Sequence, residues 1–362
     1  MNPLMLQEFH HGLGARFAKL NGADVVNDYG DWLAEHAALR ETAGVIDLSF
    51  RSRICLVGAD RVSFLHGQVT NDVKKLRVGE GCYAAITTAK GKMESDLNIF
   101  ALADELLLDF EPGLTGKIFQ RLEKHIVADD VQIVDAAPHY GLLSVQGPKA
   151  ESAVHALGLF AEIPAKPLAS VKVSDATLGE IYLVNYPRLG TSGFDLFVPN
   201  NSLGAVADKL IAAAKQIGGR ACGWQAFETA RIEAGIPRFG ADMDETNLPL
   251  ECGIESRAVT YTKGCYIGQE VINRIHSVGH VNRELRCLRL ADDLKALPQR
   301  GDKLFHAGRE AGHVTSAVKS PMFGNLALGY VRREANQIGS ELTMRTAAGE
   351  SRVKIVALPL VK

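Results

Sequence analysis

Residues 81–101 read Gly81-Cys-Tyr-Ala-Ala-Ile-Thr-Thr-Ala89, Lys90-Gly-Lys92 and Met93-Glu-Ser-Asp-Leu-Asn-Ile-Phe-Ala101. Two strand-like runs joined by a short turn that contains glycine are typical of an antiparallel hairpin. A third run, Leu106-Leu-Leu-Asp-Phe110, predicts another strand next in the chain. This part of the molecule is therefore expected to build a sheet from local hairpins.

A helix is predicted directly after these strands. Leu114, Ile118, Leu122 and Ile126 recur every four residues and so form one apolar face. From 171 to 199 the pattern returns to strand, turn and strand, with glycine and proline as breaks. Helices mixed with antiparallel hairpins, without a regular alternation of strand and helix, favour an α+β fold.

The last part of the chain has a different pattern. From about Leu285, short strand-like runs alternate with Gly, Pro, Asn or charged turns. The runs lie at 285–290, 303–306, 312–317, 326–331, 341–345 and 352–358. Many short strands with such turns are typical of a small antiparallel β-barrel. We therefore expect a domain boundary near residue 284.

Composition excludes several classes of protein. The chain has 362 residues, 46% hydrophobic and 23% charged, with a formal net charge of -2. No basic excess points to nucleic acid, and no apolar run is long enough to span a membrane. The six cysteines are scattered without a Cys-x-x-Cys pair, and the first residues lack a signal-peptide pattern. A cytoplasmic protein is the expectation.

The densest cluster of unusual residues is Lys263-Gly-Cys-Tyr-Ile-Gly-Gln-Glu270. Two glycines close together predict a tight turn or a close approach of the backbone. Cys265 lies near Lys263 and Arg274 in the sequence, and a nearby cation favours the thiolate form of a cysteine. Cys265 is therefore a candidate reactive thiol. The alternative is a small buried residue in a structural loop.

This motif resembles the signature of the YgfZ family, folate-binding proteins connected with iron–sulfur enzymes and related to the glycine-cleavage T-protein. Further landmarks resemble the T-protein along nearly the whole chain: Val45–Ser49, Gln146–Ala150, Arg231–Gly235 and Gly312–Ser316. The resemblance implies tetrahydrofolate, or a one-carbon derivative of it, as the ligand. It also implies that Cys265 is the working, catalytic thiol.

The resemblance also implies where folate would bind. Asp96 occupies the place of the T-protein aspartate near the reacting folate nitrogens, and a carboxylate there can exchange a proton with a ring nitrogen. Asp195 matches the T-protein glutamate that holds the amino-pyrimidine edge of the pterin. The motif residues expected to take part in the same site are Lys263, Gln269, Glu270 and Arg274.

Three positions depart from the T-protein pattern. Ser95 stands where T-proteins usually have a second aspartate before Asp96. Asp195 is one methylene shorter than the matching glutamate, which puts direct contact with the pterin in doubt. Phe227 replaces a T-protein arginine, and its alternative role is that of an ordinary core residue. These changes predict that folate is bound but handled differently.

A metal site is not expected. His276 and His280 are spaced as two ligands on one helix face would be. Gly279 and its neighbours, however, favour a loop or strand rather than a helix at this point. Both histidines are therefore predicted to be ordinary residues.

The resemblance implies three domains arranged as a ring around a central opening. The first α+β lobe is expected at 1–140, discontinuous, with part of 220–284. The second α+β lobe is expected at 141–284 and the barrel at 285–362. The spacing of apolar residues and the turn residues by themselves support only a mixed α+β part followed by a β-barrel.

Three functions are compatible with these residues. The first is a folate-dependent accessory protein that assembles or repairs iron–sulfur enzymes through Cys265, with those enzymes or cluster-assembly proteins as partners. The second is a tetrahydrofolate-dependent aminomethyltransferase of the glycine-cleavage type. The third is a non-catalytic scaffold. The accessory role ranks first here, whether the protein is an enzyme stays open, and a monomer is expected.

Overall fold

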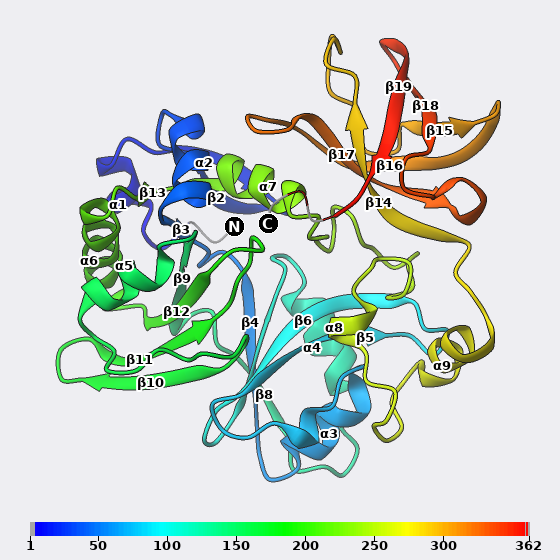
Figure 1. Ribbon diagram of the computed structural model, residues 1–362. Coiled ribbons are helices and arrows are strands. Elements are labelled where there is room, and N and C mark those ends of the chain that lie inside the picture. The colour runs from blue at the N-terminus through cyan, green and yellow to red at the C-terminus, as the bar shows by residue number, and fades with distance from the viewer. Residues whose placement is uncertain (1–3, 359, 361–362) are drawn as a thin grey trace.

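The hairpin expected at 81–101 is confirmed in the computed structural model, which describes residues 4–358 and 360 (Figure 1). It forms β5 (Gly81–Thr87) and β6 (Met93–Ala101), which pair antiparallel with Ala85 opposite Asp96. The sheet has the order β5-β6-β7-β4-β8, completed by β7 (Leu106–Phe110), β4 (Ser52–Val57) and β8 (Gln132–Asp135). We call this unit the five-stranded lobe.

One face of this sheet is covered by helices. These are α3 (Arg61–Gln68) and α4 (Thr115–Glu123), with the short 3-10 helix η1 (Val73–Lys75) after α3. Ile118 and Leu122 of α4 are fully buried, as the spacing of four predicted. They pack in one cluster with Leu97 and Ile99 of β6. Because side chains alternate along a strand, Asp96 and Asn98 of β6 lie on the opposite face.

A second sheet forms the six-stranded lobe, with the order β10-β11-β12-β9-β3-β13. Its strands are β3 (Gly44–Asp47), β9 (Tyr140–Gln146), β10 (Ser170–Asp175), β11 (Gly179–Asn185), β12 (Gly193–Pro199) and β13 (Arg220–Ala221). All neighbours are antiparallel except β13 and β3, which are parallel. The N-terminal elements belong to this side: α1 (Gln7–Gly12), β1 (Arg16–Leu20), β2 (Ala23–Asp28) and α2 (Trp32–Glu41).

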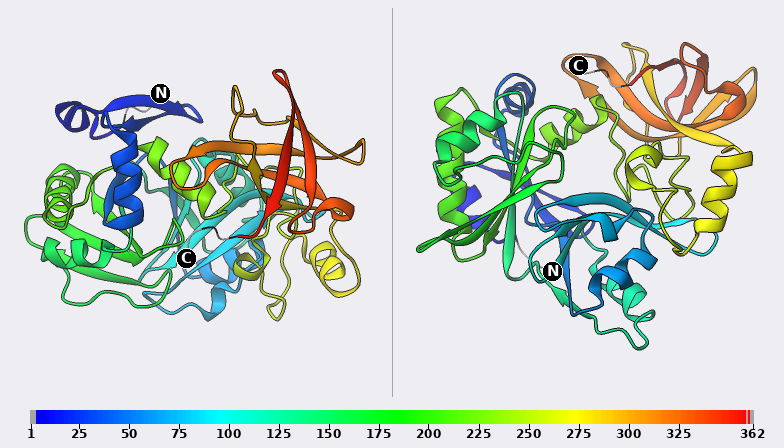
Figure 2. Two further views of the ribbon diagram at one scale, coloured as in Figure 1. Left: turned by 45° about the horizontal axis from the view of Figure 1, so that its top comes forward. Right: turned by 60° about the horizontal axis from the view of Figure 1, so that its bottom comes forward.

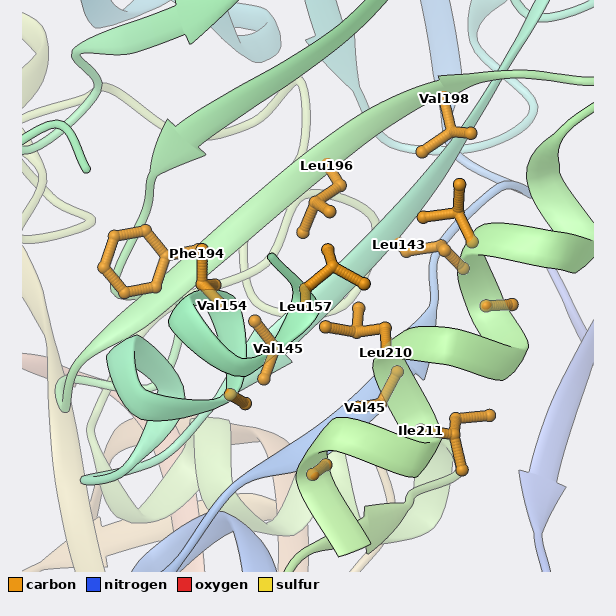
Figure 3. Packing of buried hydrophobic residues seen from close by; sticks show 14 of the residues in the cluster. Val45, Leu143, Val145, Val154, Leu157, Phe194, Leu196, Val198, Leu210 and Ile211 are labelled. Atoms are coloured by element: carbon orange, nitrogen blue, oxygen red, sulfur yellow. The ribbon is translucent and has the colours of Figure 1, made fainter. Parts of the chain in front are cut away.

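Helices α5 (Ala150–Leu157) and α6 (Leu203–Gln216) cover one face of the second sheet (Figure 3). Phe194, Leu196 and Val198 of β12 point toward them and are at most 2% exposed. Asp195, between Phe194 and Leu196, therefore points the other way. The aliphatic core of this lobe thus fixes which side chains of β12 face the centre of the molecule.

The two sheets turn their helix-free faces toward each other. A single buried cluster contains Phe100 and Leu107 from the five-stranded lobe together with Leu142 and Phe197 from the six-stranded lobe. Phe100 and Phe197 meet edge to face, with ring centroids 5.6 Å apart. Since this cluster is shared, the lobes are held in one fixed arrangement around a common centre (Figure 2).

The predicted C-terminal barrel is confirmed as a closed six-stranded barrel with the order β14-β17-β16-β15-β18-β19. Its strands are β14 (Arg283–Leu290), β15 (Lys303–His306), β16 (Arg309–Ser320), β17 (Gly324–Arg332), β18 (Glu341–Thr346) and β19 (Gly349–Val356), with the 3-10 helix η2 (Arg333–Ala335) after β17. The fold is therefore α+β followed by a β-barrel, as expected.

Helix α7 (Trp224–Glu233) connects the barrel to the six-stranded lobe. Glu233 at its end is fully buried and accepts hydrogen bonds from His36 Nε2 (2.9 Å), Arg40 Nε (2.9 Å) and Ser320 Oγ (2.5 Å). His36 and Arg40 belong to α2, whereas Ser320 ends β16. Glu233 thus holds α7 between a lobe and the barrel.

The boundary between the lobes differs from the expected one. Residues 44–47 were placed in the first lobe, but β3 pairs with β9 of the second sheet, Val45 opposite Val145. The segment after α7 lies with the five-stranded lobe, for which part of 220–284 was expected, because Thr70 Oγ1 donates to Ala258 O and α8 (Glu255–Ala258) packs on β5. Each lobe is therefore built from two separate parts of the chain. No helix within 4–358 is long and apolar enough to cross a membrane.

Candidate functional site

A cavity of about 70 Å³ lies where the inner faces of both sheets meet α7. By this measure one water needs roughly 10–15 Å³, so the cavity has room for about five waters. The five-stranded sheet contributes Tyr83, Asp96 and Asn98, and α7 contributes Trp224, Phe227 and Arg231. The other lining residues are Leu48, Arg51, Leu97, Glu111, Tyr186, Arg188, Ile236, Pro237 and Arg238.

Asp96 is a carboxylate that lines this cavity and has a shifted pKa. It is only partly exposed and accepts a hydrogen bond of 2.7 Å from the Tyr83 hydroxyl. Burial raises the pKa of Asp96 to about 6, and Glu111 acts in the same direction, whereas Tyr83 and Arg51 oppose the change. Asp96 can therefore hold or release a proton near neutral pH, as an acid–base group must.

Asp195 lies behind an arginine as seen from the cavity. It is fully buried, and Arg188 binds both of its oxygens, with Nη2 at 2.6 Å from Oδ2 and Nε at 3.1 Å from Oδ1. Arg188 lines the cavity and Asp195 does not. The resemblance implied that a ligand contacts Asp195 directly. The structure does not support that contact, because Arg188 already binds both oxygens of the Asp195 carboxylate.

The remaining arginines of the cavity are also paired. Arg51 binds Asp109 (2.8 Å) and Glu111 (2.5 Å). Arg231 and Arg238 bind carboxylates as well, and Arg238 lies 5.3 Å from the ring centroid of Trp224. Such buried pairs are costly to break, since removing one partner leaves the other charge unpaired. The polar wall is consequently a rigid network rather than a set of free charges.

Phe227 both packs in the core and lines the cavity. It is 7% exposed and stacks on Trp224, with ring centroids 5.3 Å apart. The two rings form a flat apolar wall on α7. Ser95 is fully buried and donates its hydroxyl to Asp96 O, so it adds no second carboxylate to the cavity.

The motif residues lie elsewhere. Lys263, Cys265, Gln269, Glu270 and Arg274 share one loop and the start of α9 (Gln269–Val278), and none of them lines the cavity. A ring held inside the cavity would therefore not be lined by them. The structure separates two groups of predicted site residues, one with Asp96 at the centre and one with Cys265 at the periphery.

Lys263 holds the motif loop in place. Lys263 as a whole residue is 7% exposed. Its ammonium donates hydrogen bonds to the carbonyls of His66 (2.6 Å), Val69 (2.6 Å) and Asn71 (2.8 Å). Burial lowers the pKa of Lys263 to about 8. The expectation that this ammonium acts on the Cys265 thiol is wrong, because the ammonium donates its hydrogen bonds to three backbone carbonyls.

Cys265 itself is exposed, so the alternative of a buried structural cysteine is wrong. The loop around it is fixed at both ends. Tyr266 is buried next to it, and Gly268 has a φ of +91°, where an added Cβ would lie 2.6 Å from Thr87 Oγ1. Glu270 and Arg274 are exposed on α9, and Gln269 Nε2 lies 3.4 Å from Gly264 O. An accessible thiol thus sits on an anchored loop.

The prediction of loop or strand around His276 was wrong, since α9 continues to Val278. The ring of His276 stacks on Tyr261 with centroids 3.7 Å apart, and its Nδ1 lies 2.8 Å from Glu255 Oε1. These contacts stabilise the last turn of α9, although the sequence around Gly279 favours a loop or strand. Among the residues that the structure describes, no group of three or more potential ligands could hold a metal ion.

Two known protein domains match most of this chain. The model of the GCVT N-terminal domain matches residues 6–263, and that of the glycine cleavage T-protein C-terminal barrel domain matches 283–362. The chain belongs to the glycine-cleavage T-protein family.

Relatives of similar length agree with this assignment. An aminomethyltransferase of Geobacillus thermodenitrificans is 30% identical over 360 residues, which cover 96% of this chain and 95% of the relative. One of Halalkalibacterium halodurans is 29% identical over 354 residues, 93% of this chain and 94% of the relative. The crystal structure of glycine cleavage system aminomethyltransferase T from Bartonella henselae superposes with a TM-score of 0.89, covering 99% and 98% of the chains at 23% identity.

Several cavity residues of this T-protein family member were missed from the sequence. Tyr83 donates to Asp96, Arg188 to Asp195, and Asn98 to Asp109. Tyr83 could have been found, because it lies on the strand that the hairpin pairs with Asp96. Arg188 lies in the loop between β11 and β12, and no sequence pattern indicates that it binds Asp195, seven residues later.

Proposed function

We propose that the central cavity binds a reduced folate and that the protein transfers a one-carbon unit to or from it. The observation that carries this proposal is Asp96, which lines the cavity with a pKa of about 6. A carboxyl group that titrates near neutral pH can give a proton to a ring nitrogen and take it back. Tyr83 keeps the carboxyl oriented through its hydrogen bond to Oδ2.

The cavity suits the ring end of a folate. A volume of about 70 Å³ is too small to enclose a whole folate, so most of the ligand would lie outside the cavity. Trp224 and Phe227 offer a flat apolar wall, and a few placed polar groups fix orientation in such sites. Tetrahydrofolate is therefore the ligand that we propose.

Aminomethyl transfer is the reaction that we rank first. The relatives named above are aminomethyltransferases and match this chain over almost its full length. The partner that we propose is accordingly a lipoyl carrier protein of a glycine-cleavage system. This order reverses the one drawn from the motif, in which the accessory role came first.

The test is a turnover assay with an aminomethyl-lipoyl carrier protein and tetrahydrofolate, with methylene-tetrahydrofolate as the product measured. We expect turnover by the wild type and a loss of about 10²-fold or more in Asp96→Asn, the usual contribution of an acid–base group. Asp104→Asn, at an exposed aspartate, is the matched control. Absence of turnover, with tetrahydrofolate bound normally in a calorimetric titration, would exclude the transferase and leave folate binding intact.

A second candidate is favoured by the exposed thiol of Cys265 on its anchored loop. Aminomethyl transfer in the cavity has no need of this residue. We propose for this case the narrower YgfZ type, an accessory protein that acts on iron–sulfur enzymes through Cys265. Cys265→Ala should then keep its fold and folate binding but fail to restore cluster-dependent enzymes in a strain that lacks the protein.

The outcome of that experiment separates the two candidates. Full restoration by Cys265→Ala, together with transferase turnover, would favour the transferase alone. A thiol reagent distinguishes a reactive Cys265 from a passive scaffold. Trapping faster than that of a free cysteine supports the accessory role, and slow trapping supports the scaffold.

A further inference from the structure

A cationic groove lies outside the central cavity, where α9 leads into β14 of the barrel (Figure 1). Its volume is about 740 Å³. It is lined by residues from the segment after α9, from the paired ends of β14 and β17, and from η2: His280, Asn282, Arg283, Arg332, Arg333 and Glu334. Three arginines therefore stand beside one glutamate here, although the chain as a whole has a formal net charge of -2.

The two strands that form the groove place like charges directly opposite each other. Arg283 of β14 is the antiparallel partner of Arg332 of β17. Side chains in such positions have Cβ atoms about 4.5–5.5 Å apart, and like charges there destabilise the sheet. An anion between the two guanidinium groups would offset this repulsion. The pairing is therefore unfavourable for the fold by itself and favourable for binding an anion.

Arg283 is held in place from within the barrel. Its guanidinium lies 4.9 Å from the ring centroid of Tyr330, and its Nε donates to Glu251 Oε1 at 3.3 Å. A guanidinium carries several N–H donors in a rigid plane, and the Arg283 side chain is still 28% exposed. Arg283 is thus oriented by the protein and keeps part of its donors for a ligand.

Arg332 and Arg333 are free of carboxylate partners. Both are exposed, and neither forms an ion pair with any residue in 4–358. Arg333 N donates to Asn282 O at 3.0 Å, which ties the end of β17 to the segment after α9. Glu334 is also exposed and without an ion pair in the described part of the chain. The two free guanidinium groups are consequently presented from a fixed backbone.

The positive potential continues onto the neighbouring strand β16. His313 is the antiparallel partner of Tyr330, the residue beneath Arg283. Burial lowers the pKa of His313, and the cations Arg283, Lys303 and Arg300 lower it further. Cations that oppose the protonation of a neighbouring histidine also attract an anion to the same surface.

The lining indicates which class of anion suits the groove. Sites for small organic molecules are mostly apolar, whereas every residue of this lining is charged, an amide or a histidine. None of them is Phe, Tyr or Trp, so the bases of a nucleic acid would find no ring to stack on. Glu334 would also repel a long polyanion. Arginine binds carboxylates through paired hydrogen bonds, and a short run of carboxylates therefore fits best.

We propose that this groove docks an acidic segment of a partner protein, whose carboxylates are bound by Arg283, Arg332 and Arg333. The proposal does not rest on the folate reaction proposed above. Helix α9 has ten residues and is therefore about 15 Å long. A partner held in the groove lies at one end of this helix, and Cys265 lies close to the other.

The experiment measures binding of a short, labelled oligoaspartate peptide to the full chain by fluorescence anisotropy at low salt. We expect saturable binding that weakens as salt is added, because exposed charge pairs are screened. Absence of saturable binding would overturn the proposal. Tighter binding of pyrophosphate, or of single-stranded DNA of the same length, would also overturn it, because the groove would then be a phosphate site.

The double variant Arg332→Gln/Arg333→Gln assigns the binding to the groove. Loss of two exposed charge pairs should weaken the peptide roughly 3- to 30-fold. Lys209→Gln/Lys215→Gln is the matched control, since it removes the same charge from exposed positions on α6, in the other lobe. The control should bind the peptide as the wild type does. Equal losses in both variants would mean that only net charge matters and would contradict a docking site.

Thermal unfolding without peptide separates a binding role from a structural one. Because Arg332 faces Arg283 across the ladder, Arg332→Gln removes a repulsion and should raise the Tm by up to about 3 °C. A fall in Tm would show that Arg332 serves the fold, and it would count against the proposal.

Discussion

The central cavity and the segment 263–278, which we call the thiol segment, are built on opposite principles. In the cavity, charged side chains are buried and bind one another, as Arg188 does with Asp195 and Asp109. In the thiol segment the buried cation Lys263 donates its hydrogen bonds to backbone carbonyls, and the group of chemical interest, Cys265, is exposed. The cavity is therefore suited to holding a small molecule, and the thiol segment to meeting a macromolecule or a reagent from outside.

This difference predicts how strongly substitutions in each region destabilise the protein. Breaking a buried ion pair destabilises strongly, because the remaining charge cannot regain water. An exposed side chain can be replaced at small cost. Substitutions in the two regions should consequently differ in how much they destabilise the fold and in whether they change reactivity.

The largest effect is expected at Glu233, which holds the cavity helix α7 to α2 and the barrel. Glu233→Ala leaves Arg40 and His36 buried without their partner, and we expect the free energy of unfolding to fall by about 3–5 kcal/mol. Urea unfolding measures this. Glu180→Ala, which breaks an exposed pair with Lys172 (2.8 Å), should change it by less than about 1 kcal/mol. Similar losses in both would remove the contrast between buried and exposed charges.

The next effect tests whether the thiol segment is rigid. Gly268→Ala places a Cβ in a left-handed backbone conformation and against Thr87 and Thr88, so we expect a loss of about 2 kcal/mol or more. Limited proteolysis should also cut faster between 260 and 268. Gly264→Ala is the control, because its Cβ would make an ordinary 3.5 Å contact with His66 Nε2. An unaffected Gly268→Ala would mean that the loop is not anchored there.

A smaller, pH-dependent effect is expected at Asp96. Its folded pKa of about 6 is above the ordinary value of 3.8, so the folded state binds the proton more tightly. This contribution to stability is complete below about pH 4 and is lost as pH rises through about 6. Asp96→Asn lacks that loss.

From pH 4 to pH 8, the stability of Asp96→Asn relative to wild type should rise by about 1–2 kcal/mol, less than the full shift because Asp96 is partly exposed. Thermal or urea unfolding at the two pH values measures the change. A difference independent of pH would show that Asp96 titrates normally in the folded protein.

The smallest effect on stability, with the largest on reactivity, is expected at Cys265. Cys265→Ser should change the free energy of unfolding by less than about 0.5 kcal/mol, as is usual for surface substitutions. In the native wild type a thiol reagent should label one cysteine quickly, and Cys265→Ser should remove that phase. Cys82→Ser is the control, since burial raises the pKa of the Cys82 thiol to about 12. A fast phase that survives in Cys265→Ser would place the reactive thiol elsewhere.

The amino-acid sequence by itself determined the local elements and the chemistry worth seeking. The hairpin at 81–101, the helix with Ile118 and Leu122 inward, and the six barrel strands follow from period, turn residues and apolar spacing. The same period places Asp96 on the face opposite Leu97. These features depend on neighbours in the chain, which is why they can be predicted without the fold.

Only the tertiary structure decided how the site is assembled. Arg188 and Asn98 both bind Asp109 because two separate sheets turn the same faces inward. Lys263 finds its acceptors nearly 200 residues earlier in the chain, rather than the thiol two residues away. A charged side chain takes the partner that packing brings within reach when both leave water, and sequence distance does not reveal that partner.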